Sequence, residues 1–187
     1  MRQAVLWVGL ALSIHFIATM IYLFFLHDEA RKKCFFRMPV LLQKSVVLLF
    51  VGPLFISPFL TQPRFHILIY DWLKIPLGFL LFCGGLTVII LAFFKIGVVP
   101  SLREKSALLT AGVYRVVRHP IYSGTLLAFL GVILFSEAAV SLLYFPVSVG
   151  LYYFMTVYEE KSLVAEYGLE YVEYQKKVRK RIIPYIF

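Results

Sequence analysis

The sequence predicts an all-α fold, an integral membrane bundle of about five transmembrane helices with a C-terminal amphipathic cytosolic helix. Three observations predict it: 61% of the 187 residues are hydrophobic, only 16% are charged, and the mean hydropathy is +0.85. A typical soluble domain is about 45–50% apolar and about 25% charged. This composition excludes most classes of soluble enzyme, and it also excludes intrinsic disorder.

Apolar runs account for the predicted helices, and they cover residues 4–26, 39–60, 73–94, 121–136 and 138–157. A helix over the first run reaches about 35 Å at ~1.5 Å per residue, enough for the ~30 Å hydrocarbon core. This run exceeds the ~7–15-residue core of a signal peptide, so we expect it in the mature protein. The fourth run gives only about 24 Å of helix. The last two runs are therefore either two spans or a hairpin that does not cross completely.

The basic residues predict how the helices are oriented. The net charge is +9, from 19 Lys and Arg against 10 Asp and Glu. Most of the cations fall in three segments on one predicted side: Arg31, Lys32, Lys33 and Arg37 after the first run; Lys95, Arg103, Lys105, Arg115 and Arg118 after the third; and Lys161, Lys176, Lys177, Arg179, Lys180 and Arg181 in the tail. The positive-inside rule then predicts an extracytoplasmic N-terminus and a cytosolic C-terminus. The same distribution favours anionic membrane lipids over nucleic acid as the partner of this charge.

We expect a single membrane domain over residues 1–187, because the chain has no internal repeat, low-complexity tract or linker. Residues 1–94 hold the first three spans, and Gly84 and Gly85 in the third predict close approach of another helix. Residues 95–187 hold the hairpin and the C-terminal helix. Cys34 and Cys83 have no metal-binding or redox spacing, so we predict no metal site. An oligomeric state is not predicted.

The hairpin of the last two runs is expected to bring two polar blocks together at the cytosolic membrane surface. Residues 118–122 enter it and residues 158–160 leave it. Pro120 suits the first turn of a helix, where its missing N–H is not needed. A helix N-terminus beside Arg115 and Arg118 favours a carboxylate-bearing ligand. The alternative is that Arg115, Arg118 and His119 only anchor the chain at the membrane.

The tail carries an apolar stripe at helical spacing, formed by Leu163, Tyr167, Tyr171, Tyr174 and Val178. At ~100° per residue, Glu160 falls inside this stripe and Glu159 falls on its edge. A carboxylate on a buried face near a bilayer is costly unless it has a partner. Glu160 therefore indicates either a ligand site or an ion pair with Arg118. A break of the helix at Gly168, or a tail lying on the membrane with solvated glutamates, is the alternative.

A second polar group lies inside the first span, where His15 is accompanied by Ser13 and Thr19. Polar residues at this depth are functional candidates by default, but nothing nearby in the sequence joins them, and we favour a packing role. The fifth run is rich in aromatic residues that either line a lipophilic tunnel or pack between helices, namely Tyr144, Phe145, Tyr152, Tyr153 and Phe154.

Two motifs in the second half of the chain together resemble a known family. They read Gly112-x-Tyr114-Arg115-x-x-Arg118-His119-Pro120-x-Tyr122-x-Gly124 and Glu159-Glu160-x-x-Leu163-x-x-x-Tyr167-Gly168-x-x-Tyr171-x-x-Tyr174-x-x-x-Val178, followed by Arg181-x-x-Pro184. The pattern resembles the isoprenylcysteine carboxyl methyltransferase and phospholipid methyltransferase superfamily of integral membrane methyltransferases. It covers about residues 95–187, whereas the first three spans are similar to family members only in hydropathy.

The resemblance implies a transferase that binds S-adenosyl-L-methionine in a cytosolic pocket closed by the C-terminal segment. A lipophilic or lipid-anchored acceptor would enter from the bilayer. By position, His119 and Tyr122 would contact the cofactor, while Glu159 and Glu160 would receive its amino and ribose groups. The residue chemistry agrees for Arg118, because a guanidinium at a helix N-terminus suits the methionyl carboxylate.

The pattern defines the acceptor less narrowly than the cofactor. Family members that methylate a prenylcysteine carboxylate can carry an arginine shortly before the acidic pair, whereas residues 154–158 hold no cation. An isoprenylcysteine carboxylate is the leading acceptor by resemblance, and a phospholipid amine or a thiol is the alternative. A carboxylate or thiolate needs no base, whereas an ammonium must first lose a proton. Arg118 and Tyr158 are the candidates for a catalytic role.

Two hypotheses of other classes stay open on the sequence alone. One is a membrane sterol reductase on a similar scaffold, for which the chain is short. The other is a non-catalytic membrane binding or assembly protein.

Overall fold

The computed structural model describes residues 2–28, 31, 37–65, 71–96, 108–183 of the chain. Within these residues the protein is helical and forms no β-strand. The helices are α1 (Arg2–Leu26), α3 (Val40–Ile56), α4 (Asp71–Ile96), α5 (Pro120–Ser136), α6 (Ala139–Tyr167) and α7 (Leu169–Lys177), with short 3₁₀ helices η1 (Ser57–Phe59) and η3 (Gly112–Arg115). The predicted all-α fold is confirmed, and each apolar run corresponds to one of the first five α-helices.

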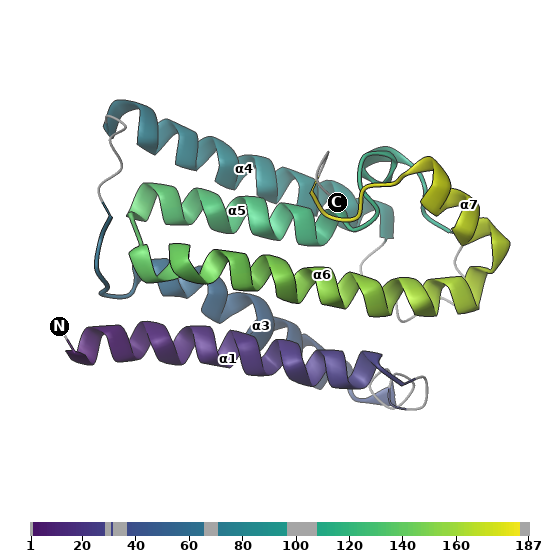
Figure 1. Ribbon diagram of the computed structural model, residues 1–187, viewed down its shortest axis with the longest axis horizontal. Helices are drawn as coiled ribbons and strands as arrows, with labels where there is room; N and C mark the ends of the chain where they lie inside the picture. The colour runs from purple at the N-terminus through teal and green to yellow at the C-terminus, as the bar shows by residue number, and fades with distance from the viewer. Residues whose placement is uncertain (1, 29–30, 32–36, 66–70, 97–107, 184–187) are drawn as a thin grey trace.

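The long helices form a bundle in which α1, α4, α5 and α6 lie side by side and α3 crosses behind them (Figure 1). By length and composition, α1, α4 and α6 can each cross a membrane. Their outer faces carry exposed large apolar side chains such as Trp7, Leu80 and Phe94, which suits contact with lipid tails rather than water. The chain is thus built as an integral membrane protein.

The other two apolar helices are shorter. Both α3 and α5 contain 17 residues, or about 25 Å of helix, which is less than the ~30 Å hydrocarbon core. For α5 this length was expected. For α3 the apolar run is longer than the helix, because Pro58 has no N–H to donate and the chain continues as the 3₁₀ helix η1.

Backbone-to-backbone packing of α4 on α5 depends on four glycines, two on each helix and seven residues apart in each pair. A Cβ built on Gly85 would lie 2.4 Å from the carbonyl oxygen of Gly124, and one built on Gly78 would lie 2.8 Å from that of Gly131. Any side chain at these positions would force the helices apart. The predicted close approach at Gly85 is confirmed, whereas Gly84 has only an ordinary van der Waals neighbour, Leu127.

The helix ends next to the three cationic segments gather at one end of the bundle. In Figure 1 these are the ends of α1 and α4, the starts of α3 and α5, and the α6–α7 junction. Lys32, Lys33, Arg103 and Lys105 lie outside the described residues, as does Cys34. At the opposite end, Lys74 Nζ lies 2.6 Å from Glu137 Oε1 in a largely buried ion pair. Among the described residues, the helix ends that flank the three cationic segments thus lie at one end of the bundle, as the sequence predicts.

The apolar stripe of the tail does not lie on one continuous helix. Gly168 has φ 58° and ψ −129°, a conformation that only glycine adopts readily, and it ends α6 and begins α7. The alternative of a break at Gly168 is thus the correct one. Even so, Tyr171, Tyr174 and Val178 of the second segment cluster with Leu163 and Tyr167 of the first.

Candidate functional site

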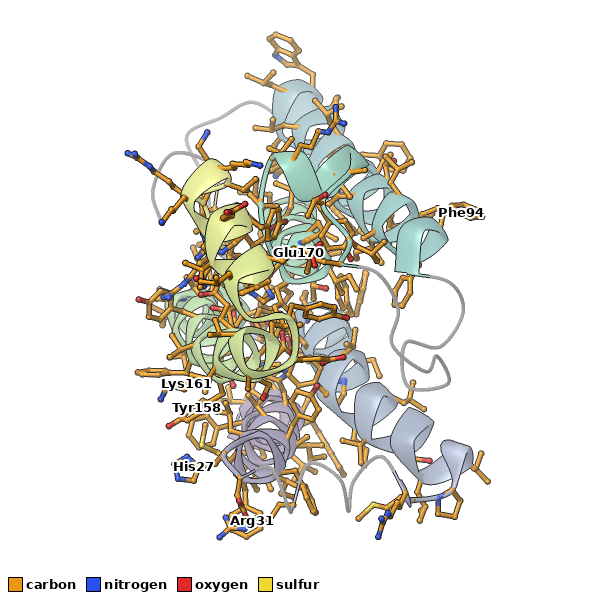
Figure 2. The ribbon with its side chains drawn as sticks, turned by 90° about the vertical axis from the view of Figure 1, so that its right-hand side faces the viewer. His27, Arg31, Phe94, Tyr158, Lys161 and Glu170 are labelled. Atoms are coloured by element: carbon orange, nitrogen blue, oxygen red, sulfur yellow. The ribbon has the colours of Figure 1, made fainter. Side chains whose placement is uncertain are left out.

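The start of α5 and the last turns of α6 meet at the end of the bundle that Figure 2 views, where Tyr158 and Lys161 of α6 lie near His27 and Arg31 beyond α1. His119 is the N-cap of α5 and Pro120 occupies its first turn, which confirms the predicted helix start. About 40 residues separate this point from Glu159 and Glu160 in sequence. Contacts of residues 118–122 with Glu159 and Glu160 confirm that the two polar blocks are neighbours.

Glu160 is the centre of a buried ionic cluster. Its side chain is only 4% exposed, and its Oε1 lies 2.7 Å from Arg118 Nε. Its Oε2 accepts hydrogen bonds from Arg181 Nε at 3.0 Å and from Gln175 Nε2 at 3.1 Å. Each carboxylate oxygen therefore has a cationic partner, which is what a buried carboxylate requires. The predicted burial of Glu160 and its ion pair with Arg118 are both confirmed.

Glu159 faces a different set of groups and is more accessible, with 23% of its side chain exposed. Tyr122 donates a hydrogen bond to its Oε1, and the hydroxyl of Tyr22 on α1 lies 3.5 Å from the same oxygen. Its Oε2 lies 3.3 Å from His119 Nδ1. Among the described residues, the partners of Glu159 are thus two hydroxyls and the His119 imidazole, and no arginine contact with it is seen.

The C-terminal segment lies across the start of α5 and is bonded to it through the backbone (Figure 1). Arg118 N–H donates to Lys180 O and His119 N–H donates to Arg181 O, both at 2.9 Å. Ser123 Oγ donates to Ile182 O, and the Arg118 guanidinium donates to Val178 O at 2.6 Å. Arg118 is thus directed to protein groups, so its side chain positions the C-terminal segment.

His119 lies between the two carboxylates, with Nδ1 3.3 Å from Glu159 Oε2 and Nε2 3.3 Å from Glu160 Oε1. Burial lowers the pKa of the imidazole, but the hydrogen bonds and charges of Glu159 and Glu160 outweigh this, and the pKa of His119 is raised above its ordinary value. The protonated ring donates from both nitrogens. The two carboxylates therefore favour the protonated form of His119.

The ring of Tyr122 is stacked between two other aromatic rings. Its centroid lies 5.9 Å from that of His119 at an interplanar angle of 16°, and 5.3 Å from that of Tyr152 at 15°. The stack fixes the Tyr122 hydroxyl against Glu159. Of the other aromatic residues of α6, Phe154 points outward and is 57% exposed, while Tyr144 and Tyr152 pack among the helices.

The tyrosines of the tail hold α7 against the loop that precedes α5. Tyr174 donates its hydroxyl to Tyr114 O at 2.7 Å. Burial raises the pKa of Tyr174 to about 12, with smaller opposing effects of Arg118 and Glu160, so this hydroxyl stays protonated and keeps donating.

Two predicted candidates lie outside the cluster. The Tyr158 ring stacks edge-on against His27, with centroids 5.4 Å apart, and Lys161 Nζ lies 5.1 Å from its centre. It therefore faces α1 and does not contact Arg118. Arg115 is exposed, as a membrane-anchoring residue would be. Pro184 of the quoted motif lies outside the described residues.

Comparison with known proteins identifies the family. Residues 73–170 match the family model described as phospholipid methyltransferase. The chain belongs to the phospholipid methyltransferase family. The matched residues of this family member span α4, α5 and α6 and therefore include all four packing glycines and both members of the acidic pair.

This phospholipid methyltransferase family member is also similar to one curated protein. Over 76 residues it is 37% identical to protein-S-isoprenylcysteine O-methyltransferase B of Arabidopsis thaliana, a match that covers 40% of this chain and 39% of that relative. Less than half of the relative's length is thus matched. The predicted resemblance to the superfamily is confirmed.

Sequence reasoning did not assign three residues of this methyltransferase family member to the site. Arg181 and Gln175 bind Glu160, and Tyr22 reaches Glu159. Arg181 belongs to the quoted motif, but its position in the sequence does not indicate which residue it binds. Tyr22 follows His15 by seven residues and Thr19 by three, so helical periodicity places all three on one face of α1, and this was the available signal.

Proposed function

We propose that the protein is an S-adenosyl-L-methionine-dependent methyltransferase that acts on a lipophilic or lipid-anchored acceptor at the cytosolic membrane surface. The observation that carries the proposal is the meeting of Arg118, His119 and Tyr122 with the Glu159–Glu160 pair. Membership of a membrane methyltransferase family supports the same reaction class. The cationic end of the bundle supports a cytosolic site.

The two carboxylates suit different tasks toward the cofactor. Glu159 is partly exposed and is held by two hydroxyls and His119, so it suits an ammonium or ribose hydroxyl as ligand. Glu160 is almost fully buried and its oxygens are already engaged by arginine. We therefore assign cofactor contact to Glu159 and to the Tyr122 and His119 rings beside it. Glu160 and Arg118 act as positioning residues.

When bound, S-adenosyl-L-methionine supplies a methyl group on a sulfonium, which is activated for in-line displacement. The task of the protein is then to align two reactants and exclude water. Tyr122, stacked between His119 and Tyr152, gives a rigid wall for this purpose. The bonds from residues 118–123 to residues 178–182 keep the C-terminal segment over the buried end of the site.

An isoprenylcysteine carboxylate is the acceptor that we favour. The isoprenylcysteine methyltransferase relative supports this acceptor. Residues 154–158 of α6 hold no cation, and Arg181 places one close to this stretch. Its guanidinium donates to the Tyr153 hydroxyl at 3.0 Å, one to two turns before the acidic pair. A phospholipid amine and a thiol are the alternative acceptors, and an amine would require a base.

The test is a methyl-transfer assay with labelled S-adenosyl-L-methionine and purified protein in lipid nanodiscs. Farnesylcysteine, phosphatidylethanolamine and a long-chain thiol are offered separately. Transfer to farnesylcysteine is expected, and transfer to another acceptor would replace the carboxylate assignment. A parallel titration with S-adenosylhomocysteine tests the cofactor site itself, and absence of binding would overturn the proposal.

The acidic pair is tested by matched variants in the same titration. Glu159→Gln removes a charge-assisted contact worth about 1.5–3 kcal/mol, so affinity for S-adenosylhomocysteine should fall about ten- to hundredfold. Glu166→Gln changes an exposed glutamate on the same helix and should leave the affinity unchanged. Equal affinity of the two variants would contradict the assignment of Glu159.

A further inference from the structure

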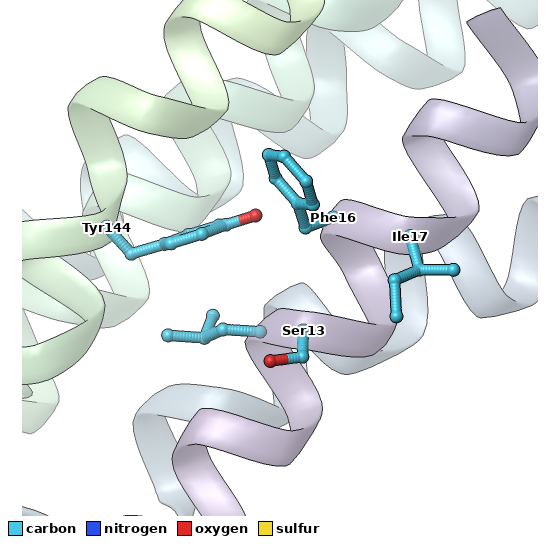
Figure 3. Close-up of a pocket in the computed structure, with 5 residues that line it drawn as sticks. Ser13, Phe16, Ile17 and Tyr144 are labelled. Carbon is cyan, nitrogen blue, oxygen red and sulfur yellow. The ribbon is translucent and has the colours of Figure 1, made fainter.

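Helix α1 packs against α6 and carries one polar side chain to the acidic pair. Figure 3 shows the two helices near the start of α6, where the Tyr144 ring extends toward α1 with its hydroxyl directed toward Phe16. The cavity drawn there has a volume of about 380 Å³ and is lined by Leu12, Ser13, Phe16, Ile17 and Tyr144. Tyr144 lies roughly 22 Å of helix away from Glu159. The contact between α1 and the acidic pair is made farther along α1, by Tyr22.

The polar face of α1 fixes the position of Tyr22. His15, Thr19 and Tyr22 follow at spacings of four and three residues and therefore lie on one face of the helix. His15 Nδ1 donates to Phe50 O at 2.5 Å, and Thr19 donates to His15 O at 2.7 Å. Both side chains are fully buried, which agrees with the packing role predicted for them. The Tyr22 ring packs in the same core, with its centroid 6.5 Å from that of Phe50.

The partners of Glu159 divide unequally between its two oxygens. Oε1 accepts from the hydroxyls of both Tyr22 and Tyr122. Because a carboxylate oxygen has about two lone-pair sites, these two hydroxyls occupy Oε1. Oε2 contacts only Nδ1 of His119, at 3.3 Å, among the residues that the structure describes. The oxygen with room for a further donor is therefore Oε2, and the side chain is 23% exposed.

The hydroxyl of Tyr22 serves this carboxylate rather than the packing of α1. Its ring fills space beside Phe50, and a phenylalanine ring would fill the same space. The hydroxyl lies 3.5 Å from Oε1, at the long end of the range for a hydrogen bond. Hydrogen bonds of active sites are often long before the ligand binds and shorten in the complex.

We propose that Tyr22 is a positioning residue for the methyl transfer proposed above, on which this assignment rests. Its hydroxyl, together with that of Tyr122, holds Oε1 so that Oε2 is presented to the ammonium or ribose hydroxyl of S-adenosyl-L-methionine. The family model matches residues 73–170, so Tyr22 lies outside the matched part of the chain. Helix α1 then completes a site whose other members lie on α5 and α6.

The first test is a titration of the full chain in lipid nanodiscs with S-adenosylhomocysteine. Tyr22→Phe keeps the ring and leaves Tyr122 and His119 on Glu159, so the variant should fold normally. Its affinity should fall about three- to tenfold, because one hydrogen bond to the ligand-binding carboxylate is lost. Tyr144→Phe is the control, since it removes a hydroxyl between the same two helices but far from Glu159, and it should bind normally.

A double-mutant cycle tests whether Tyr22 acts through Glu159. In the Glu159→Gln background, Tyr22→Phe should lower the affinity by less than twofold, because the carboxylate that it positions is absent. The same loss in both backgrounds would overturn the proposal, as would an unchanged affinity of the single variant Tyr22→Phe. Absence of binding to the wild-type protein would instead overturn the proposed function.

Turnover separates positioning from a structural role. With the acceptor that the wild-type protein methylates, Tyr22→Phe should raise the KM for S-adenosyl-L-methionine about three- to tenfold and leave kcat within twofold. A partly unfolded protein would lose kcat at unchanged KM. That second pattern would reject Tyr22 as a positioning residue.

Discussion

Arg181 binds Glu160 through two nitrogens, with Nε and Nη2 each 3.0 Å from the same carboxylate oxygen. The pair connects the segment that follows α7 to the last turns of α6. Because Arg118 occupies the other oxygen of Glu160, one carboxylate joins three parts of the chain. The position of the C-terminal segment therefore depends on this single buried acid.

We predict that Glu160→Gln destabilises the protein strongly. It leaves the buried Arg118 without its counter-ion, and loss of one partner of a buried pair costs about 3–5 kcal/mol. Arg181→Gln should cost less, because Arg118 and His119 still bind Glu160. Thermal unfolding of the purified proteins measures this order, with exposed Glu166→Gln as the control. Similar midpoints for Glu160→Gln and Glu166→Gln would contradict the role of the cluster.

A second prediction concerns the packing of α4 on α5. A Cβ on Gly124 would lie 2.6 Å from Gly85 O and 2.7 Å from a side-chain carbon of Ile89. Gly124→Ala must therefore separate the helices, and we expect a loss of about 1–3 kcal/mol from overpacking. Gly150→Ala is the matched control on α6, where a Cβ meets nothing within 4 Å. It should be neutral or stabilising, since alanine favours helix more than glycine.

The contrast between these two alanine variants is the informative measurement. Thermal midpoints are compared in the same detergent, together with the yield of monodisperse protein. Equal stability of Gly124→Ala and Gly150→Ala would contradict the close approach of the α4 and α5 backbones.

Much of the fold could be predicted because apolar runs and prolines act locally. The runs gave five helices, and Pro120 marked the first turn of α5. The meeting of Arg118 with Glu160 also followed, because a short hairpin leaves little freedom for the residues at its two ends. Local rules and short connections were enough for this part of the candidate site.

The remaining site residues depend on contacts that sequence spacing does not encode. Gly168 turns the chain, and the direction that α7 then takes decides whether Gln175 and Arg181 reach Glu160. The helical periodicity of the apolar residues predicts α6 and α7 as one continuous helix and does not predict the turn at Gly168. Tyr22 reaches Glu159 from α1, and the packing of α1 on α6 cannot be read from either helix alone.

A third prediction follows from His119, whose pKa is raised in the folded protein by Glu159 and Glu160 despite burial. A raised folded pKa contributes stability that is fully present below the unfolded value of about 6.5. This stability is lost as pH rises through the folded pKa. The thermal midpoint of the protein should therefore fall as the pH increases above neutrality.

The variant His119→Gln tests the origin of that pH dependence. Glutamine cannot be protonated, so the difference in midpoint between the two proteins should be largest near pH 6 and should shrink toward pH 9. Nitrogen chemical shifts of labelled histidine report the titration directly. A difference that does not vary with pH would contradict a charged His119 between the carboxylates.

The last prediction concerns the opposite end of the bundle, where Lys74 and Glu137 form a largely buried ion pair with side chains 9% and 13% exposed. Glu137 ends α5 with φ 55°, and the pair ties this turn to the first turns of α4. Lys74→Met or Glu137→Gln alone breaks this ion pair while one of its two charges stays largely buried, and should cost about 3 kcal/mol. The double variant removes both charges and should recover most of that loss. Thermal midpoints of the four proteins complete a double-mutant cycle with an expected coupling of about 1–3 kcal/mol, whereas additive losses would show that the two charges do not stabilise each other.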